Sequence, residues 1–257
     1  MRENWVRRKL LKGEVSVGSW VTLEGTLGAE VMANAGFDWL VIDMEHGPMS
    51  LSQAQGSIAA IRTTETIPLV RVCWNETDLI QQTLDIGAFG LVIPMVSTRA
   101  EAEKAVKDSR YPPLGERSRG GMRSRLAFKT DAGTYGRQAD NEILILTQIE
   151  TREAVANAAE ILSLDGIDGL FVGPNDLASS IGQWPLVWDN QVPELAEAIA
   201  RIPVLARDYH KISGIMVPNA AIARRCIALG YTFIALTNDA ALLEQAARRE
   251  LAAVTEG

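Results

Sequence analysis

Short apolar segments alternate with longer amphipathic ones eight times along the chain, and this alternation restricts the folds open to it. Apolar runs bounded by turn residues are typical of strands that are buried on both faces, as in parallel sheets. Strands are predicted over residues 15–20, 38–43, 67–72, 89–95, 143–149, 167–172, 212–217 and 231–236. Helices are predicted over residues 25–36, 51–62, 76–87, 98–108, 151–162, 219–229 and 239–253, with one or two more before residue 209. Eight βα units favour a closed (β/α)8 barrel, an α/β fold of the TIM-barrel type.

The length of the chain is consistent with one such barrel. Its 257 residues match the roughly 250 that are typical of a (β/α)8 barrel, so a single domain over residues 1–257 is predicted. A doubly wound open sheet is the alternative, but no GxGxxG motif follows the first predicted strand. Two segments, 110–142 and 174–193, interrupt the alternation, and long loops of this kind tend to be functional or to mediate assembly.

The composition favours a protein that acts on small molecules. The net charge is −7, whereas nucleic-acid and anionic-membrane surfaces need clustered lysine and arginine. No run of 18 apolar residues is present, and the first residues lack the pattern of a signal peptide. Cys73 and Cys226 are far apart in sequence and are expected to be reduced thiols. We therefore expect a cytoplasmic protein without nucleic-acid or membrane partners.

Polar residues follow several predicted strands at the point where each strand ends. In a barrel of parallel strands these ends converge on one mouth, where such barrels carry their active sites. The residues that this rule brings together include Glu45, His46, Arg71, Gln148, Glu150, Gly173, Pro174, Asn175 and Asp176. The sequence therefore predicts a functional site at the carboxyl end of the barrel.

Glu150 and Asp176 follow adjacent predicted strands, and Gln148 lies beside them. Two carboxylates without a nearby cysteine or second histidine form a hard oxygen site, which suits Mg²⁺ or Mn²⁺. The alternative is structural: Glu150 would interact with the dipole of the following helix, and Asp176 would cap the helix after it. Spacing alone does not separate these two interpretations.

Arg71 and His46 also have two interpretations each. Arg71 interrupts an apolar strand, so it either neutralises a buried acid such as Asp43 or Glu45, or binds a substrate carboxylate or an enolate oxygen. His46 is either a core histidine or a general base at the strand end. Asp85, near the end of the predicted helix 76–87, could orient His46, although its position in the sequence is typical of a solvated helix residue.

Some reaction types are disfavoured by what the strand ends lack. None of the lysines falls at the end of a predicted strand, whereas a Schiff-base aldolase needs a desolvated lysine in the mouth. The last two strand ends also lack a glycine-rich phosphate cradle, which disfavours a phosphorylated substrate.

Six motifs, taken in order, give the chain a resemblance to a known family. They are DMEHGP at 43–48, PLVRV at 68–72, LDIGA at 84–88, YPPLG at 111–115, QIET at 148–151 and GPNDLA at 173–178. From about residue 18 to residue 243 the chain resembles the metal-dependent class II pyruvate aldolases of the HpcH/HpaI type. The resemblance implies a barrel of the phosphoenolpyruvate/pyruvate-domain type. It also implies a homo-hexamer, a dimer of trimers in which a terminal helix is exchanged between subunits.

The resemblance also implies roles for individual residues. Glu150 and Asp176 would hold a divalent cation, Mg²⁺ or Mn²⁺, with Co²⁺ as a further candidate. His46 would be the base, oriented by Asp85, and Arg71 would stabilise the enolate. The substrate would be bound by Arg71, Gln148, Gly173, Pro174 and Asn175. Two departures from the family pattern, Met44 with Gly47 and the segment 116–121, are expected near the acceptor path or a subunit contact and leave the substrate open.

The reaction implied is a reversible retro-aldol cleavage, catalysed by a carbon–carbon lyase. A 4-hydroxy-2-oxo acid would give pyruvate, or hydroxypyruvate, and an aldehyde. Two rivals are a related enolate-forming lyase, acting on an acyl-CoA ester or resembling macrophomate synthase, and a barrel that no longer catalyses. A CoA enzyme should show a basic surface near the mouth, and only the arginines between residues 117 and 125 offer one; these could instead form a subunit contact.

Overall fold

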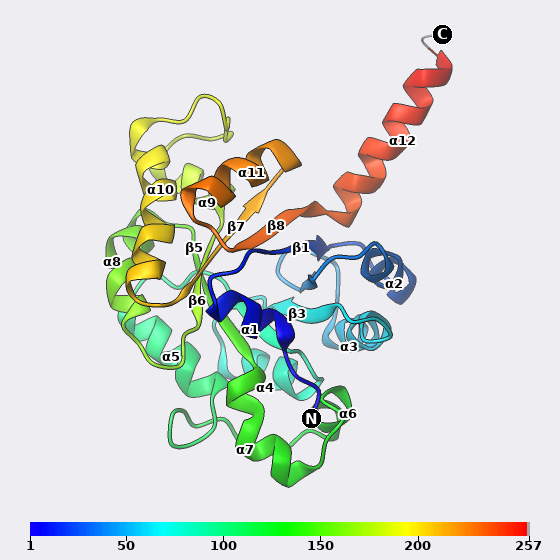
Figure 1. The fold of residues 1–257 in the computed structure, drawn as a ribbon, viewed down its shortest axis with the longest axis vertical. Helices are drawn as coiled ribbons and strands as arrows, with labels where there is room; N and C mark the ends of the chain where they lie inside the picture. Colours follow the sequence, from blue (N-terminus) through cyan, green and yellow to red (C-terminus); the bar gives the residue numbers. More distant parts are fainter. Residues whose placement is uncertain (256–257) are drawn as a thin grey trace.

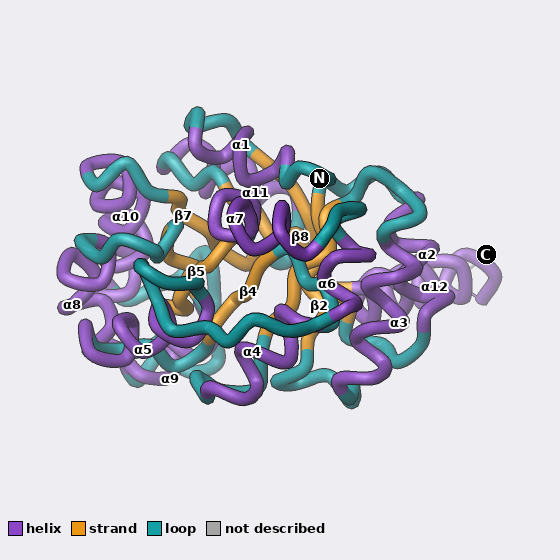
Figure 2. The backbone as a smooth tube through the Cα atoms, turned by 90° about the horizontal axis from the view of Figure 1, so that it is seen from below, coloured by secondary structure: helices purple, strands orange, loops and turns teal. Residues whose placement is uncertain are grey.

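The computed structural model describes residues 1–255 and confirms the predicted barrel. Eight parallel strands close into one barrel, in which each strand pairs with its neighbours in chain order. The strands are β1 (Ser16–Val21), β2 (Trp39–Asp43), β3 (Ile67–Arg71), β4 (Gly90–Ile93), β5 (Leu144–Ile149), β6 (Gly169–Val172), β7 (Ile212–Val217) and β8 (Phe233–Asn238). They lie at the centre of the molecule with helices around them (Figures 1 and 2). The last two residues of the domain predicted over 1–257 lie outside the described part of the chain.

Helices connect the strands and cover the outside of the barrel. They are α1 (Trp5–Leu11), α2 (Thr26–Asn34), α3 (Leu51–Ile61), α4 (Thr77–Asp85), α5 (Arg99–Ser109), α6 (Met122–Ala127), α7 (Ala132–Glu142), α8 (Arg152–Leu162), α9 (Pro174–Ile181), α10 (Pro193–Asp208), α11 (Ala220–Leu229) and α12 (Asp239–Thr255). The local sequence determines where two of these helices begin. Ser50 and Thr98 form capping boxes, in which their side chains accept hydrogen bonds from N–H groups in the first turns of α3 and α5. Within residues 1–255, no helix is both long and apolar enough to cross a membrane.

Four strands end at positions that differ from the prediction: β1 and β3 by one residue, and β4 and β8 by two. The two larger differences affect the mouth. β8 ends at Asn238, two residues later than predicted, so Asn238 belongs to the strand and not to the loop after it. β4 ends at Ile93, and Met95 has a φ angle of 54°, which no strand accommodates. The turn at Met95 directs its backbone N–H toward the carboxylate of Glu150.

Aromatic side chains fill the interior of the barrel from one end to the other. Trp39 and Phe233 stack with their ring centroids 3.7 Å apart. Phe171 packs edge-on against both Phe233 and Trp20. The barrel is therefore a packed core and not a channel, and Trp20 and Phe171 form the floor of the mouth.

The amino-terminal end of the barrel is closed in part by the segment 110–142, which was predicted to be a long irregular loop. That prediction is wrong in part, because the segment contains α6 and α7, which lie near the N-terminus (Figure 1). Phe128 stacks on Phe89 at 3.9 Å, and Arg110 donates a hydrogen bond to Asp168 at 2.7 Å. Helices this short are marginal alone, so these tertiary contacts stabilise them.

Helix α12 extends away from the barrel (Figure 1). Asp239 at its start is its one buried residue. Leu243, Leu251 and Val254 are all more than 60% exposed, so the helix presents apolar side chains to the outside of the chain.

Candidate active site

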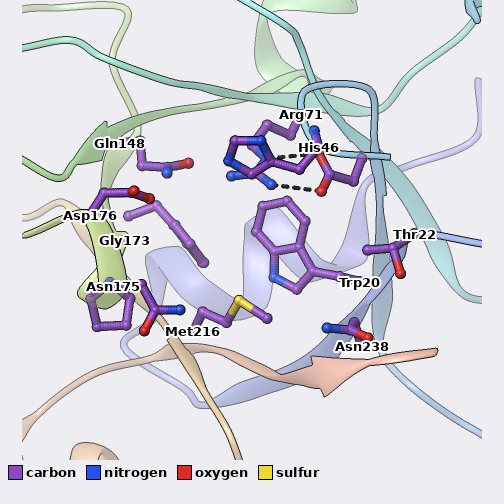
Figure 3. Close-up of a pocket in the computed structure, with 13 residues that line it drawn as sticks. Trp20, Thr22, His46, Arg71, Gln148, Gly173, Asn175, Asp176, Met216 and Asn238 are labelled. Atoms are coloured by element: carbon purple, nitrogen blue, oxygen red, sulfur yellow. Dashed lines mark hydrogen bonds and ion pairs between the residues drawn. The ribbon is translucent and has the colours of Figure 1, made fainter. Parts of the chain in front are cut away.

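A pocket of about 220 Å³ lies at the carboxyl ends of the strands, where the mouth was predicted. Seven of the predicted site residues line it: His46, Arg71, Gln148, Gly173, Pro174, Asn175 and Asp176. Figure 3 shows Arg71 and His46 together on one side, with Gln148 and Asp176 across from them and the Trp20 ring beside the guanidinium. Residues that are far apart in the sequence therefore face one cavity.

Asp43, the last residue of β2, fixes the loop that carries Glu45 and His46. Its Oδ1 atom accepts hydrogen bonds from the backbone N–H groups of Glu45 at 3.1 Å and His46 at 3.3 Å. The turn requires glycine at position 47, because a Cβ atom there would lie 2.3 Å from the carbonyl oxygen of Asp43. Gly47, noted above as a departure from the family pattern, thus has a local structural reason.

Arg71 is held on three sides. Its Nε and Nη2 atoms donate to the carboxylate of Asp43 at 2.9 and 2.6 Å, and its Nη1 atom lies 2.9 Å from Glu45 Oε2. The guanidinium stacks over the Trp20 ring at 4.4 Å. The prediction that Arg71 neutralises a buried acid is confirmed, and the same side chain also lines the pocket. The carboxylate of Asp43 accepts from two of the five N–H donors of Arg71, so the guanidinium retains donors for a ligand.

His46 is not a core histidine. Its side chain is 64% exposed and lines the pocket, which removes the structural interpretation considered above. The nearest carboxylate is that of Glu45, whose Oε2 atom lies 3.9 Å from His46 Nε2.

Asp85 lies away from this site. It ends α4, and because α4 returns from the carboxyl end of β3 to the start of β4, its last residue lies at the amino-terminal end of the barrel. There Asp85 Oδ1 accepts a hydrogen bond from Arg117 Nη2 at 2.7 Å. The expectation that Asp85 orients His46 is therefore not met within one chain, and such a contact requires a second copy of the chain.

The segment 116–121 lies at the same far end, between the C-terminus of α5 and β5. Of the two places expected for this segment, the acceptor path is not met within one chain, and a subunit contact stays a prediction. Arg117 is fully buried there, stacked on Tyr111 at 4.8 Å and near Tyr135.

Gln148 and Asp176 line the side of the pocket across from His46, and Glu150 lies beside Gln148 without lining the pocket itself. Glu150 is 3% exposed, its Oε1 atom accepts a hydrogen bond from the Met95 N–H at 2.5 Å, and Oε2 contacts the amide nitrogen of Gln148. Gln148 Oε1 is buried without a hydrogen-bond partner. Asp176 does not cap α9, because Gly173 occupies the cap position and Asp176 lies in the first turn.

This donor set fits a divalent cation with few protein ligands. Two carboxylates and an amide oxygen without a partner are hard ligands, and Mg²⁺ is often held by one or two carboxylates with water and substrate oxygens. Among residues 1–255 no cluster of three or more histidine, cysteine or acidic side chains has the geometry of a metal site. A cation here would therefore depend on substrate and water to complete its coordination.

Glu150 and Glu45 have perturbed acidities. Burial raises the pKa of Glu150 above its ordinary value, and the charge of Asp176 adds to the shift, whereas the hydrogen bonds from Met95 and Gln148 oppose it. Burial likewise raises the pKa of Glu45 to about 7, against the opposing charge of Arg71. Carboxyl groups perturbed in this way are concentrated at functional sites.

Several pocket residues were not predicted from the sequence. Trp20, Thr22, Phe171 and Met216 line the cavity together with the predicted residues. Trp20 and Phe171 are apolar residues within strands and carry no signal that separates them from other core positions. Asn238 also lines the cavity, as the rule that strand ends converge on the mouth predicts for a residue that follows the eighth predicted strand.

Gly173 must be a glycine for the donor set to keep its arrangement. A Cβ atom at this position would lie 2.9 Å from Gln148 Nε2 and 3.2 Å from Glu150 Oε2. We expect Gly173→Ala to lower Mn²⁺ affinity by about 10- to 100-fold, as displacing neighbours of metal ligands commonly does. Isothermal titration checks this. Gly28→Ala, where a Cβ meets nothing within 4 Å, is the matched control and should bind like the parent.

Comparison with known proteins places this geometry in a family. The family model described as HpcH/HpaI aldolase/citrate lyase matches residues 16–246. A protein of Salmonella dublin named 4-hydroxy-2-oxo-heptane-1,7-dioate aldolase is 40% identical over 245 residues, which is 95% of this chain and 92% of the relative.

Solved structures agree with this match. A HpcH/HpaI aldolase/citrate lyase family protein from Burkholderia cenocepacia J2315 superposes with a TM-score of 0.90 at 32% identity, covering 98% of this chain and 99% of the other. Macrophomate synthase superposes with a TM-score of 0.86 at 24% identity, covering 98% of this chain and 88% of the other, which shows a shared fold alone. The family match spans nearly the whole barrel and every strand that carries a pocket residue. The chain therefore belongs to the HpcH/HpaI aldolase/citrate lyase family.

Proposed function

We propose that this protein is a class II, divalent-metal-dependent aldolase. It cleaves a 4-hydroxy-2-oxo acid reversibly to pyruvate, or hydroxypyruvate, and an aldehyde. The observation that carries the proposal is one pocket in which Gln148 and Asp176 lie across from Arg71 and His46. The buried carboxylate of Glu150 contacts the Gln148 side chain beside this pocket. The naming of 40%-identical relatives as 4-hydroxy-2-oxo-heptane-1,7-dioate aldolases supports it.

Each residue has a chemical task in this reaction. A divalent ion held by Glu150 and Asp176, with Gln148 beside it, supplies Lewis-acid chemistry at the 2-oxo group when bound. The N-terminus of α9, formed by Gly173, Pro174 and Asn175, receives the substrate carboxylate, because the helix dipole attracts anions there. Pro174 has no N–H and the Gly173 N–H is bonded to the Ile149 carbonyl, so among these three residues the donor is the Asn175 N–H. Arg71 donates to the oxygen on which enolate charge develops.

His46 moves the proton. During cleavage it takes the 4-hydroxyl proton through a water, the C3–C4 bond breaks, and its electron pair forms the enolate as the aldehyde leaves. Proton delivery to C3 then gives pyruvate. In the synthetic direction His46 accepts the C3 proton by the same route. Its exposed ring at the edge of the pocket leaves space for that water.

His46→Asn should lower the rate of pyruvate C3 proton exchange by about 10²- to 10⁴-fold, the usual contribution of general-base catalysis. Mn²⁺ affinity should stay unchanged, because His46 is not among the oxygen ligands. His210→Asn is the matched control: His210, the other histidine, lies in the turn before β7 at the amino-terminal end of the barrel. Loss of metal binding together with His46 would contradict its role as base.

The test of the proposed function is NMR of pyruvate C3 proton exchange in D₂O, with metal-free protein and with Mg²⁺, Mn²⁺ or Co²⁺ added. Enolisation precedes any choice of aldehyde, so the result does not depend on knowing the acceptor. Exchange that requires the ion supports the proposal. No exchange with any of the three ions overturns it and favours a related lyase or a barrel that has lost catalysis.

The acyl-CoA alternative finds no support in the placement of the arginines. Arg117, Arg119, Arg123 and Arg125 lie at the amino-terminal end of the barrel, opposite the mouth of the same chain. A CoA ester in the pocket would meet no basic surface from this cluster.

The proposal includes Mg²⁺ or Mn²⁺ as the ion, a homo-hexamer and a cytoplasmic location. The hard oxygen ligands support the choice of ion. The exposed apolar residues of α12 support assembly through that helix. Cys73 and Cys226 are both free thiols, as expected in a reducing compartment.

A further inference from the structure

Asn238, the last residue of β8, lines the pocket although a regular strand would turn it away. Phe233 points into the barrel and stacks on Trp39, and the side chains of a strand alternate between its two faces. Continued along β8, this alternation would place residues 235 and 237 inside and Asn238 outside. The backbone near the end of β8 must therefore depart from regular strand geometry.

The pairing of β8 with β1 shows this departure. The register pairs Gly18 of β1 with Ala235 of β8. Two residues later on β1, Trp20 pairs with Asn238, which is three residues later on β8. The extra residue on β8 is a β-bulge, a feature that is common beside active sites, where it changes the direction of a side chain.

The bulge is strained and is held by the neighbouring strand. Thr237 has a φ angle of 48°, which is unfavourable for a β-branched residue. The hydroxyl of the buried Ser19 donates to the carbonyl oxygen of Leu236 at 2.9 Å and lies 3.2 Å from that of Thr237. Strain of this kind is concentrated at functional sites, so the direction of Asn238 calls for a functional reason.

Asn238 and its partner in the register offer N–H donors to the mouth. Asn238 Oδ1 accepts a hydrogen bond from the Ala241 N–H at 2.8 Å, which leaves the NH2 group for a ligand. The indole N–H of Trp20 is buried and has no acceptor among residues 1–255. A buried N–H without an acceptor is costly, and a ligand oxygen would satisfy it.

Thr22 adds an acceptor oxygen to the same part of the pocket. Its hydroxyl donates to Asp239 Oδ1 at 2.6 Å, and its backbone N–H donates to the same atom at 2.8 Å. Because the hydroxyl proton is committed to Asp239, Oγ1 offers only lone pairs to a ligand. Trp20, Thr22 and Asn238, called the polar wall below, thus present N–H donors and one acceptor and carry no charge.

A carboxylate would be poorly placed at the polar wall. The buried carboxylate of Asp239 lies directly behind Thr22. Arg71 is the one arginine or lysine among the described residues that line the pocket, and Asp43 and Glu45 already pair with it. An anionic group would therefore meet a negative charge and no unpaired cation within one chain. A hydroxyl group, in contrast, can accept from an N–H and donate to Thr22.

We propose that the polar wall binds the aldehyde substrate, and that this aldehyde carries hydroxyl groups and no carboxylate. The inference rests on the proposed function, because it names the second substrate of the same reaction. The 2-oxo acid is assigned to the side of the pocket with Gln148 and Asp176. Figure 3 shows Thr22 and Asn238 on the other side of Trp20, which leaves the polar wall for the aldehyde.

The test follows the aldol addition of pyruvate to three aldehydes by NMR with the Mn²⁺-loaded protein. Glyceraldehyde carries two hydroxyl groups, propanal has the same carbon chain without them, and 4-oxobutanoate ends in a carboxylate. We expect kcat/KM for glyceraldehyde to exceed that for 4-oxobutanoate by about 10-fold or more, because the carboxylate would leave water for a wall that lacks a cation. A parent protein that uses 4-oxobutanoate as well as glyceraldehyde overturns the inference.

Asn238→Leu keeps a similar volume and removes the amide donors. We expect the ratio of kcat/KM for glyceraldehyde to kcat/KM for propanal to fall by about 3- to 10-fold, the usual worth of a hydrogen bond. Each ratio is taken within one protein, so a general loss of activity cancels. Asn34→Leu, at an exposed asparagine that ends α2, is the matched control and should keep the parent ratio.

The outcomes separate this inference from the proposed function. A ratio that stays unchanged in Asn238→Leu overturns the inference, and the comparison of aldehydes with the parent protein tests it even if that variant does not fold. Pyruvate C3 proton exchange, measured without aldehyde, reports on the proposed function alone. Lack of exchange in the parent protein contradicts the proposed function, whereas exchange together with a preference for 4-oxobutanoate contradicts only the assignment of the aldehyde.

Discussion

Glu150→Gln should abolish divalent-ion binding and, with it, metal-dependent pyruvate exchange. Glu150 is the buried member of the two-carboxylate site, held by the Met95 N–H and Gln148. Glutamine fills the same space but places an amide N–H where the ion needs an anionic oxygen. We expect an exchange rate lower by at least about 10³-fold, since both ligand charge and enolate stabilisation are lost. Isothermal titration with Mn²⁺ and NMR of the exchange measure the two effects.

The control is Glu153→Gln, an exposed carboxylate three residues further on in the first turn of α8. It should bind Mn²⁺ and exchange pyruvate like the parent. Mn²⁺ binding that survives in Glu150→Gln would exclude Glu150 as a ligand.

The carboxyl group of Glu150 also makes ion binding depend on pH. Because burial raises the pKa of Glu150, protons compete with the cation at pH values where an ordinary glutamate is already ionised. Mn²⁺ affinity should therefore rise with pH through the acidic range as Glu150 loses its proton. Gly173→Ala, which keeps Glu150, should retain this dependence.

The barrel and the location of its mouth could be predicted from the sequence because both follow from a regular alternation. Apolar runs mark strands buried on both faces, and parallel strands place their carboxyl ends together. Arg71 and Gln148 were identifiable in this way, as polar residues at or near the ends of apolar strands. The two helices within the segment 110–142 could not be identified in this way, because α6 and α7 are stabilised by contacts with distant parts of the chain, such as that of Phe128 with Phe89.

The pairing of side chains within the mouth could be predicted only in part. Position in the sequence shows that Glu45 and Asp43 are near Arg71, but not that Asp43 takes two donors and leaves Glu45 Oε2 without a hydrogen bond. Asp85 failed as a predicted neighbour of His46 for a topological reason. A residue at the end of a helix that follows a barrel strand lies at the far end of the barrel, and this could have been inferred from the predicted elements.

Asp168→Asn should destabilise the protein by about 3–5 kcal/mol, the usual cost of removing one partner from a buried ion pair. Asp168 is buried at the amino-terminal end of the barrel. It accepts hydrogen bonds from Arg110 and Arg7, each at 2.7 Å, and from the Ile145 N–H at 2.7 Å. Arg110 is 1% exposed, so its guanidinium would be left buried without its counter-charge.

The effect is measurable by denaturant or thermal unfolding at pH 7, where about 3–5 kcal/mol corresponds to a fall in Tm of about 6–20 °C. Asp208→Asn, an exposed acid at the same end of the barrel, should change stability by less than about 0.5 kcal/mol. Burial alone would raise the pKa of Asp168, but Arg110 and Arg7 outweigh burial and the pKa lies below its ordinary value. The folded state therefore gains stability from the ionised carboxylate above about pH 4 and loses it as the pH falls further. The difference between parent and Asp168→Asn should shrink on acidification, and a difference that stayed constant would show that packing and not charge is responsible.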